Sequence, residues 1–299
     1  MKNIMAGQYI PLRSKIESGF AIYQAHRRGD FSNPAADIAY HRSLLVDLAK
    51  YTNISIRAAR TLDLGCGQKA TQTALFHADG ANATGIDVEV PTFKFGIGAF
   101  FQTLQRHGAE RAFKSLARHV LFDGRFFSEL SRLYGQPVSF EQLDVHIMDA
   151  TATSFDDSTF DFVSSMAVFE HISDVPAAVQ ELNRILKPGG IAVITPHLFP
   201  SLSGGHCLEW LHPDQMPAKN VEPWDHLRDN LHPAGAYMNH MKLSEYRDIF
   251  RTLLNVVDEQ VTREGEHYLA PQLEAELLKK GYSREDLLTR TVTFFARKK

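Results

Sequence analysis

The sequence predicts an α/β fold: a Rossmann-like doubly wound sheet of about seven strands with helices on both faces. Short apolar runs alternate with helical segments from about residue 60 onward, which is typical of such sheets. A glycine-rich turn follows the first apolar run, and an aspartate ends the next one about 20 residues later. The length of 299 residues and the 44% hydrophobic content allow a sizeable core, so we expect one domain over residues 1–299.

The first half of the chain begins with a helical N-terminal cover over residues 1–58, in which residues 12–58 read as helical. A plausible cap at Asn33, Pro34 in the first turn and apolar residues at helical spacing indicate the main helix there. The elements expected next are a strand at 61–64, a turn at 65–67, a helix at 70–77, and strands at 82–90, 143–152 and 158–168.

The second half continues the alternation. The elements expected are a helix at 175–186 that Gly189 and Gly190 terminate, a strand at 191–199, a helix at 243–254, and strands at 255–261 and 289–298. Two segments interrupt the pattern: a mostly helical insertion at 91–142 and an irregular loop at 198–241, rich in Pro, Gly, His and Trp. A loop of that length in a compact domain is usually functional, so we call residues 198–241 the lid loop.

Composition argues against several classes of function. The formal net charge of −3 gives the molecule no general attraction to nucleic acid or membrane. No apolar run approaches the roughly 20 residues needed to span a bilayer, and the N-terminus does not resemble a signal peptide. Two cysteines make no disulfide framework, which fits a reducing compartment. We therefore expect a cytoplasmic protein with a small-molecule substrate; a homo-oligomer is compatible with the sequence.

The carboxyl ends of the expected strands predict a nucleotide-like site, because ligands of doubly wound sheets bind there. Gly65 and Gly67 lack a Cβ, so their backbone can approach a ligand closely. Asp87 ends the second strand, where a carboxylate can bind both ribose hydroxyls. Asp149 follows the third strand, where it could accept a hydrogen bond from a purine amine.

Five ordered motifs carry a resemblance to a known family. The segments LDLGCG, GIDVEV, MDAT, FDFVSSMAVFEHI and LKPGGIAVITP resemble those of class I S-adenosylmethionine-dependent methyltransferases. The resemblance implies S-adenosylmethionine as methyl donor. It implies that the methionine part is held by Asp63, Gly65 and Gly67, and the ribose by Asp87. It also implies that the adenine is held by Asp149 and Ala150, and that Met166 and Ala167 line the floor below the sulfonium. The alternatives are a nicotinamide dehydrogenase, which LKPGG disfavours, and a cofactor-binding module without catalysis.

The acceptor depends on the segments that cover the site. Between Lys94 and Arg132 the insertion has seven Lys and Arg against three Asp and Glu, or +4, and it is rich in Phe. An amphipathic helical pair would explain most of these residues. A cavity with a cationic rim would instead suit an acceptor with an apolar body and an anionic head. Arg125 is then the first candidate for the anion, with His41 and Arg42 behind it.

Glu170 and His171 follow the fourth expected strand, where an acceptor would meet the methyl group. Either residue could simply brace the loop. A hydroxyl acceptor needs a base, for which His171 is the ordinary candidate. An alkene acceptor would give a carbocation, which aromatic faces shelter and a carboxylate such as Glu170 deprotonates. Trp210 and Tyr268 would supply aromatic faces.

Glu170, Trp210 and Tyr268 together resemble the geranyl diphosphate C-methyltransferases. This second resemblance implies a prenyl diphosphate substrate, Mg²⁺ bound through its diphosphate, and loss of a proton from the methylated cation. The alternative acceptor is a hydroxyl or amine of a sugar or small natural product. In HCLEWLHPD, four residues lie close enough in sequence to suggest a protein-bound metal: His206, Glu209, His212 and Asp214. The spacing matches no standard zinc pattern, so hydrogen-bonded structural histidines, or Mg²⁺ that bridges an anionic substrate, are the favoured alternatives.

Overall fold

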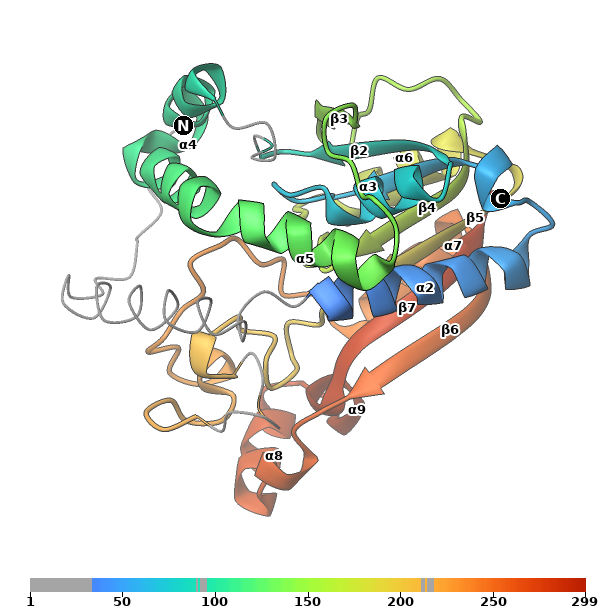
Figure 1. The fold of residues 1–299 in the computed structure, drawn as a ribbon. Coiled ribbons are helices and arrows are strands. Elements are labelled where there is room, and N and C mark those ends of the chain that lie inside the picture. Colours follow the sequence, from blue (N-terminus) through green and yellow to red (C-terminus); the bar gives the residue numbers. More distant parts are fainter. Residues whose placement is uncertain (1–33, 90, 92–95, 211–212, 214–217) are drawn as a thin grey trace.

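The computed structural model describes residues 34–89, 91, 96–210, 213 and 218–299 (Figure 1). The part of the N-terminal cover before residue 34 lies outside these residues, as do Phe93, Lys94 and Phe95. Helix α2 (Pro34–Tyr51) confirms the described part of the cover, with Pro34 at its start. A short turn, η1 (Ile56–Ala58), leads into the sheet.

One seven-stranded sheet forms the centre of the molecule, in the order β3-β2-β1-β4-β5-β7-β6. The strands are β1 (Arg60–Leu64), β2 (Asn82–Asp87), β3 (Asp144–Ile147), β4 (Phe160–Met166), β5 (Leu186–Thr195), β6 (Asn255–Arg263) and β7 (Thr289–Arg297). β1 to β5 are parallel, which confirms the predicted fold class. The sheet is mixed rather than wholly parallel, because β7 lies antiparallel between β5 and β6. Two helices that we did not predict, α8 (Pro271–Lys279) and α9 (Arg284–Leu288), precede β7.

Helices bury both faces of the sheet, as parallel strands require. α2 and α3 (Thr71–Ala78) cover one face, and α6 (Val175–Ile185) and α7 (Leu243–Leu253) cover the other. Neighbouring residues of a strand point to opposite faces. Phe294 accordingly packs with the α6–α7 side, while Phe295 packs with the α2–α3 side.

The LKPGG segment differs from the prediction. We expected Gly189 and Gly190 to terminate α6, but the helix ends at Ile185 and both glycines lie inside β5. The reason is that Leu186 already pairs with Phe160 of β4, so extended backbone begins there. Gly189 adopts a φ of +83°, and the pairing register shifts next to it, which is typical of a bulge.

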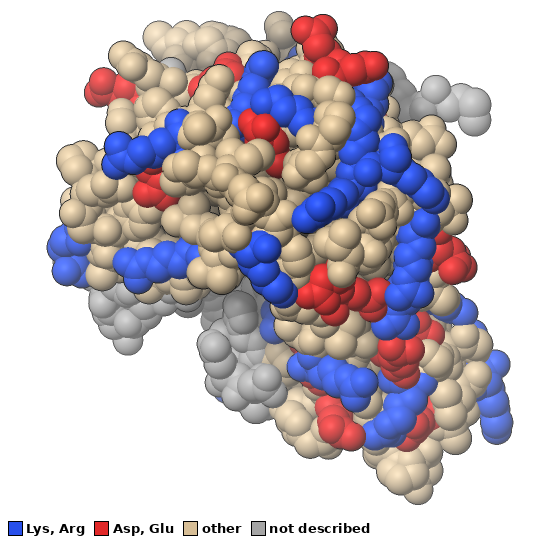
Figure 2. Space-filling view, turned by 90° about the vertical axis from the view of Figure 1, so that its right-hand side faces the viewer, with Lys and Arg blue, Asp and Glu red and all other residues tan. Residues whose placement is uncertain are grey.

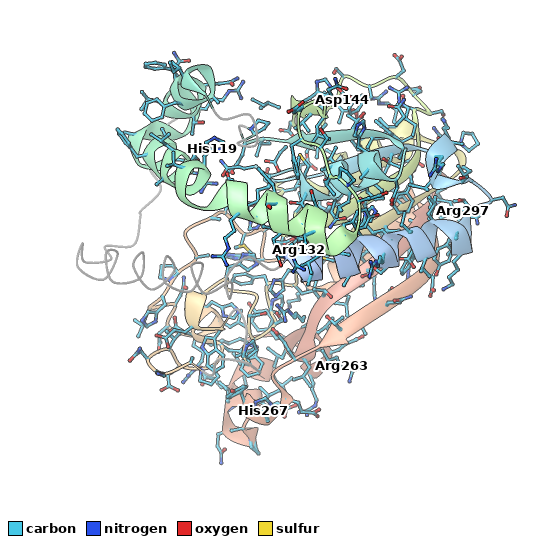
Figure 3. The ribbon with its side chains drawn as sticks, viewed as in Figure 1. His119, Arg132, Asp144, Arg263, His267 and Arg297 are labelled. Carbon is cyan, nitrogen blue, oxygen red and sulfur yellow. The ribbon has the colours of Figure 1, made fainter. Side chains whose placement is uncertain are left out.

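The insertion is helical, as predicted. It consists of α4 (Ile97–Arg118), a π-helical turn η2 (His119–Asp123) and α5 (Gly124–Tyr134). α4 stands away from the sheet in Figure 1, and Figure 3 labels His119 at its junction with α5. Phe101 and Phe113 are exposed on α4, whereas Phe126 of α5 is buried. The expected inward-facing helical pair therefore holds for α5 but not for α4.

The lid loop is irregular, as predicted, with only the short turns η4 (Leu208–Trp210) and η5 (Asp225–Leu227) in its described part. It nevertheless has an apolar core, which it shares with α8 and α9, near His267 in Figure 3. We call this core the lid cluster; its buried members are Phe199, Leu202, Trp210, Val221, Trp224, Leu227, Met238, Leu269, Leu277, Leu287 and Leu288.

Basic and acidic side chains are interspersed on the face shown in Figure 2, which agrees with the small net charge. Among the described residues, no helix is both long enough and apolar enough to cross a bilayer.

Candidate functional site

The turn after β1 is a tight bend at the carboxyl edge of the sheet. The N–H groups of Gly65 and Cys66 both donate to the carbonyl oxygen of Ile86, at 2.8 and 3.0 Å. Gly65 has a φ of +78°, and a Cβ there would lie 2.2 Å from a methyl carbon of Val168. Gly67 has a φ of +66°, but no atom of the described residues lies within 4 Å of a Cβ built on it. The bend is thus fixed on one side and open on the other, which leaves a ligand access to its backbone.

Asp87 links this bend to the end of β2. Its Oδ2 accepts a hydrogen bond from the N–H of Gly67 at 2.8 Å, and its Oδ1 accepts one from the N–H of Glu89 at 2.8 Å. Burial raises the pKa of Asp87, and these two backbone bonds lower it in part. Each oxygen retains acceptor capacity, so two ribose hydroxyls could bind here.

A cavity of about 240 Å³ opens beside Asp87. Its lining residues are Leu64, Gly65, Ile86, Asp87, Val88, Met148, Asp149, Ala150, Thr151, Val168, His171, Ile172, Ser173 and Asp174. The cavity thus brings together Gly65, Asp87, Asp149, Ala150 and His171 of the predicted site. Asp149 is exposed and its Oδ1 accepts hydrogen bonds from the N–H and the hydroxyl of Thr151, both at 2.8 Å.

Four predicted cofactor residues do not line the cavity: Asp63, Gly67, Met166 and Ala167. The Oδ2 of Asp63 accepts from the backbone N–H and the hydroxyl of Thr73, at 3.0 and 2.8 Å, so this carboxylate braces the start of α3. Burial raises its pKa to about 6. Met166, expected below the sulfonium, is 41% exposed and does not line the cavity. Val168 lines the cavity instead, and its side chain lies against Gly65.

Glu170 is fully buried in the turn η3 (Phe169–His171) after β4. Asn239 of the lid loop holds this turn: its backbone N–H donates to the Glu170 carbonyl at 2.9 Å, and its side chain donates to the carbonyls of Phe169 and Ile172. Neither carboxylate oxygen of Glu170 has a hydrogen-bond partner among the described residues. Burial raises its pKa to about 7, offset only in part by nearby backbone N–H groups.

Two histidines adjoin Glu170, and we call Glu170, His197 and His206 the histidine cluster. One ligand-type atom from each lies within 4.8 Å of the others. His206 Nε2 is 3.2 Å from His197 Nδ1, while His197 Nε2 is 2.8 Å from the hydroxyl of Ser203. Burial lowers the pKa of His197 to about 3 and that of His206 to about 4. Both rings are therefore neutral near pH 7.

A pair of glycines in the lid loop directs His206 toward this cluster. A Cβ on Gly204 would lie 2.1 Å from the carbonyl oxygen of Leu198, and one on Gly205 would lie 2.4 Å from the His226 ring. His206 itself has a φ of +52°, a conformation that is costly for a side chain with a Cβ. Gly204 and Gly205 are therefore required by the backbone path.

His171 joins the cluster to the cavity. Its ring lines the cavity, and its Nδ1 lies 2.8 Å from the carbonyl oxygen of Tyr237, so Nδ1 carries the proton. Its Nε2 then carries the lone pair of the ring, which can accept a proton. The ring centroid of His171 is 5.2 Å from that of His206. Of the predicted pair, Glu170 thus belongs to the histidine cluster, whereas His171 lines the cavity.

The predicted aromatic shell belongs to the lid cluster. The rings of Trp210 and Tyr268 pack edge to face with centroids 4.9 Å apart. The indole N–H donates to the carbonyl of Val221 at 3.1 Å, and the Tyr268 hydroxyl donates to that of Pro213 at 3.3 Å. Trp210 is only 4% exposed, so it is a core residue of the lid cluster rather than the wall of an open pocket. Tyr268 is half-buried.

The three candidates for anion binding differ in exposure: one is buried and two are exposed. His41 is buried between α2 and α3, with its Nδ1 3.2 Å from Gln72 Oε1 and its Nε2 2.8 Å from Asp79 Oδ2. No ring nitrogen is left for a diphosphate, so that role for His41 is corrected. Arg42 on α2 and Arg125 on α5 are exposed.

Of the four residues considered for a metal site within HCLEWLHPD, the structure describes only His206 and Glu209. The Glu209 carboxylate accepts from the backbone N–H groups of Lys219 and Asn220 and from the Asn220 side chain, each at 2.8 Å. His212 and Asp214 lie outside the described residues. His206 instead joins Glu170 and His197. Sequence reasoning missed His197, although a histidine near the carboxyl end of the strand expected at 191–199 was a usable signal.

Comparisons with known proteins find likenesses to methyltransferases over part of the chain. Residues 95–194 match the family described as "Methyltransferase domain", a span that begins after β2 and ends within β5. A demethylmenaquinone methyltransferase of Staphylococcus haemolyticus is 32% identical over 82 residues, which are 27% of this chain and 34% of that protein. The PKS-NRPS hybrid synthetase cheA of Chaetomium globosum is 28% identical over 153 residues, 47% of this chain and 3% of that protein. The chain thus spans about a third or less of these relatives' lengths.

Solved structures give weaker likenesses. A geranyl diphosphate C-methyltransferase from Streptomyces coelicolor, solved with Mg²⁺, geranyl diphosphate and S-adenosylhomocysteine, has a TM-score of 0.46 and 13% identity, with 88% of this chain and 79% of that chain covered. YcgJ from Bacillus subtilis has a TM-score of 0.44 and 16% identity, with 87% and 99% covered. Such low scores support no argument about substrate. The sheet order nevertheless shows a Rossmann-like fold, and the match to the methyltransferase family covers residues 95–194, about a third of the chain.

Proposed function

We propose that the protein is an S-adenosylmethionine-dependent methyltransferase acting on a small molecule. The observation that carries the proposal is the cavity at the carboxyl edge of the sheet, where the Gly65 bend, Asp87 and Asp149 converge. The open side of Gly67 fits the close approach of an amino-acid moiety. Asp87 fits a ribose, and the apolar side chains of Ile86, Met148 and Ile172 fit an adenine ring.

S-adenosylmethionine, when bound, supplies an electrophilic methyl group. The residues of this chain would position it and receive the acceptor. Asp87 fixes the ribose and the Gly65 bend fixes the amino-acid part, which would aim the methyl group toward the end of β4. His171 lies there, and its Nε2 can take a proton from an acceptor hydroxyl or amine.

An oxygen or nitrogen acceptor is the chemistry that the surroundings of His171 support best. Three imidazole rings lie in series from the cavity inward, since His206 contacts both His171 and His197. Such a polar wall suits an acceptor with hydroxyl groups, such as a sugar or a small natural product. It offers little shelter to a carbocation, because Trp210 is enclosed in the lid cluster.

A prenyl diphosphate is the second candidate acceptor. The observation in its favour is Glu170, a buried carboxylate without a hydrogen-bond partner that could receive the proton of a methylated cation. The basic insertion would then face the diphosphate with Arg125, and Mg²⁺ would bind through that group. This candidate requires the acceptor to reach Glu170, which is 0% exposed among the described residues.

One experiment separates these proposals. The purified protein is titrated with S-adenosylmethionine by calorimetry and then incubated with the methyl-labelled donor and a panel of sugars, phenols, amines and prenyl diphosphates. We expect donor binding, and label transfer to a hydroxyl or amine that His171→Ala reduces at least about 100-fold. Label on a prenyl carbon, lost in Glu170→Gln, would establish the second candidate. Absence of donor binding would refute both. Donor binding without transfer to any acceptor would support a binding module instead.

A further inference from the structure

The histidine cluster has the composition and spacing of a metal site. Glu170 comes from the turn after β4, His197 lies two residues after the end of β5, and His206 comes from the SGGH turn of the lid loop. Three separate segments thus deliver one carboxylate and two imidazoles to a common point, where their ligand atoms lie within 4.8 Å of one another. Two imidazoles and one carboxylate form a recurrent ligand set for divalent transition metals.

The distance between the two imidazoles fits a shared ion. Zinc–imidazole bonds are about 2.1 Å long, so two such nitrogens on one ion lie about 3.0 Å apart at a right angle and about 3.4 Å apart at a tetrahedral angle. His197 Nδ1 and His206 Nε2 are 3.2 Å apart, between these two values. The pair could bind one ion with little movement of either ring.

Partners around His197 fix the ring form that a metal needs. Ser203 donates its hydroxyl proton to Glu264 at 2.6 Å, so its oxygen accepts from His197 Nε2 at 2.8 Å. The proton of His197 is therefore on Nε2, and the lone pair on Nδ1 faces His206. Arg290, 3.5 Å from Glu264, compensates the charge of that carboxylate. Metal-binding histidines commonly donate their second nitrogen to such a chain.

Glu170 supplies an independent observation. It is completely buried, and neither oxygen has a hydrogen-bond partner among the described residues. A buried carboxylate without partners is costly, and the usual remedies are a counter-charge or a metal ion. The positive φ angles of Ala167 and His206, +54° and +52°, show that the backbone is strained on both approaches to this point.

We propose that Glu170, His197 and His206 bind a divalent transition metal ion of the Zn²⁺ type. Two imidazoles favour such an ion over Mg²⁺ and Ca²⁺, which prefer oxygen ligands. His206 is half-buried and its ring lies against His171, which lines the cavity, so a bound ion would adjoin the cavity. There the ion would bind an acceptor hydroxyl and make its proton more acidic, with His171 Nε2 receiving that proton. This catalytic role, unlike the metal site itself, rests on the proposed function.

The test measures metal binding directly. The full chain is stripped with a chelator and titrated with Zn²⁺ and, separately, Mg²⁺ by calorimetry, with elemental analysis of the dialysed product. We expect one Zn²⁺ per chain, bound at least about 100-fold more tightly than Mg²⁺. His206→Gln and Glu170→Gln should each weaken zinc binding at least about 100-fold, and Ser203→Ala about 10-fold, because it removes only the outer partner.

The matched control is His146→Gln. His146 is an exposed histidine on β3, 2.7 Å from the carboxylate of Asp144, so it reports adventitious binding at a surface pair. Zinc binding should survive this substitution unchanged. Absence of tight zinc binding, or zinc binding that persists in both cluster variants, overturns the proposal and leaves the cluster a hydrogen-bonded chain. If Glu170→Gln does not fold, as judged by circular dichroism, His206→Gln decides the question.

The same samples keep this proposal apart from the proposed function. Each is also titrated with S-adenosylmethionine, whose expected contacts do not involve the cluster. Donor binding without zinc binding overturns only the metal site. Zinc binding without donor binding overturns the proposed function and leaves the metal site intact.

Discussion

Two carboxylates at the same edge of the sheet have opposite surroundings. Asp87 ends β2, is half-buried, lines the cavity and accepts two backbone hydrogen bonds. Glu170 follows β4, is fully buried and has no partner for its carboxylate among the described residues. The backbone has therefore completed the first site before any ligand arrives. The second site is incomplete, which indicates that something other than the described protein atoms is needed to stabilise it.

The largest expected effect tests how firmly the backbone prepares the Asp87 side. Gly65→Ala places a Cβ at a positive φ and 2.2 Å from the Val168 side chain. The conformational cost and the overpacking together should lower the free energy of unfolding by about 2–5 kcal/mol. Urea unfolding followed by circular dichroism measures the loss.

Gly67→Ala is the matched control for that substitution. It also has a positive φ, but in the described part of the chain no atom lies within 4 Å of its Cβ, so only the conformational cost of about 1–2 kcal/mol remains. Equal losses in the two variants would contradict the fixed-side and open-side description of the bend.

The buried carboxylate of Asp63 should lower the free energy of unfolding once it is ionised. Its pKa is raised by burial from 3.8 to about 6. Between these values the unfolded chain loses the proton first, so stability falls as the pH rises from about 4 to 6. Above pH 6 the penalty is complete and on the order of 3 kcal/mol. Asp63→Asn should remove this slope: its stability relative to the wild type should rise by that order between pH 4 and pH 7. Parallel stability curves for the two proteins would contradict the assignment.

The sequence predicted the Asp87 side well and the Glu170 side poorly, for a physical reason. Gly65, Gly67 and Asp87 lie within a short span, where strand, bend and strand follow one another and local rules fix their relation. His197 and His206 meet Glu170 only because β5 pairs with β4 and because Gly204 and Gly205 allow the chain to fold back. That meeting depends on tertiary packing. The insertion shows the same limit, since periodicity predicted helices but could not tell that α4 exposes Phe101 and Phe113.

The smallest expected effect tests whether the Glu170 side is incomplete. In metal-free protein, Glu170→Leu replaces a buried carboxylate without partners by an apolar side chain of similar size. The substitution should therefore stabilise the fold by about 1–3 kcal/mol, measured by urea unfolding in the presence of a chelator. Asp87→Leu is the control and should destabilise, because it removes the acceptors of the Gly67 and Glu89 N–H groups. If Glu170→Leu also destabilises, the carboxylate has a partner in solution, and the contrast between the two sides fails. If it stabilises while abolishing methyl transfer, the buried charge is maintained for function at the expense of stability, as expected of a ligand-binding group.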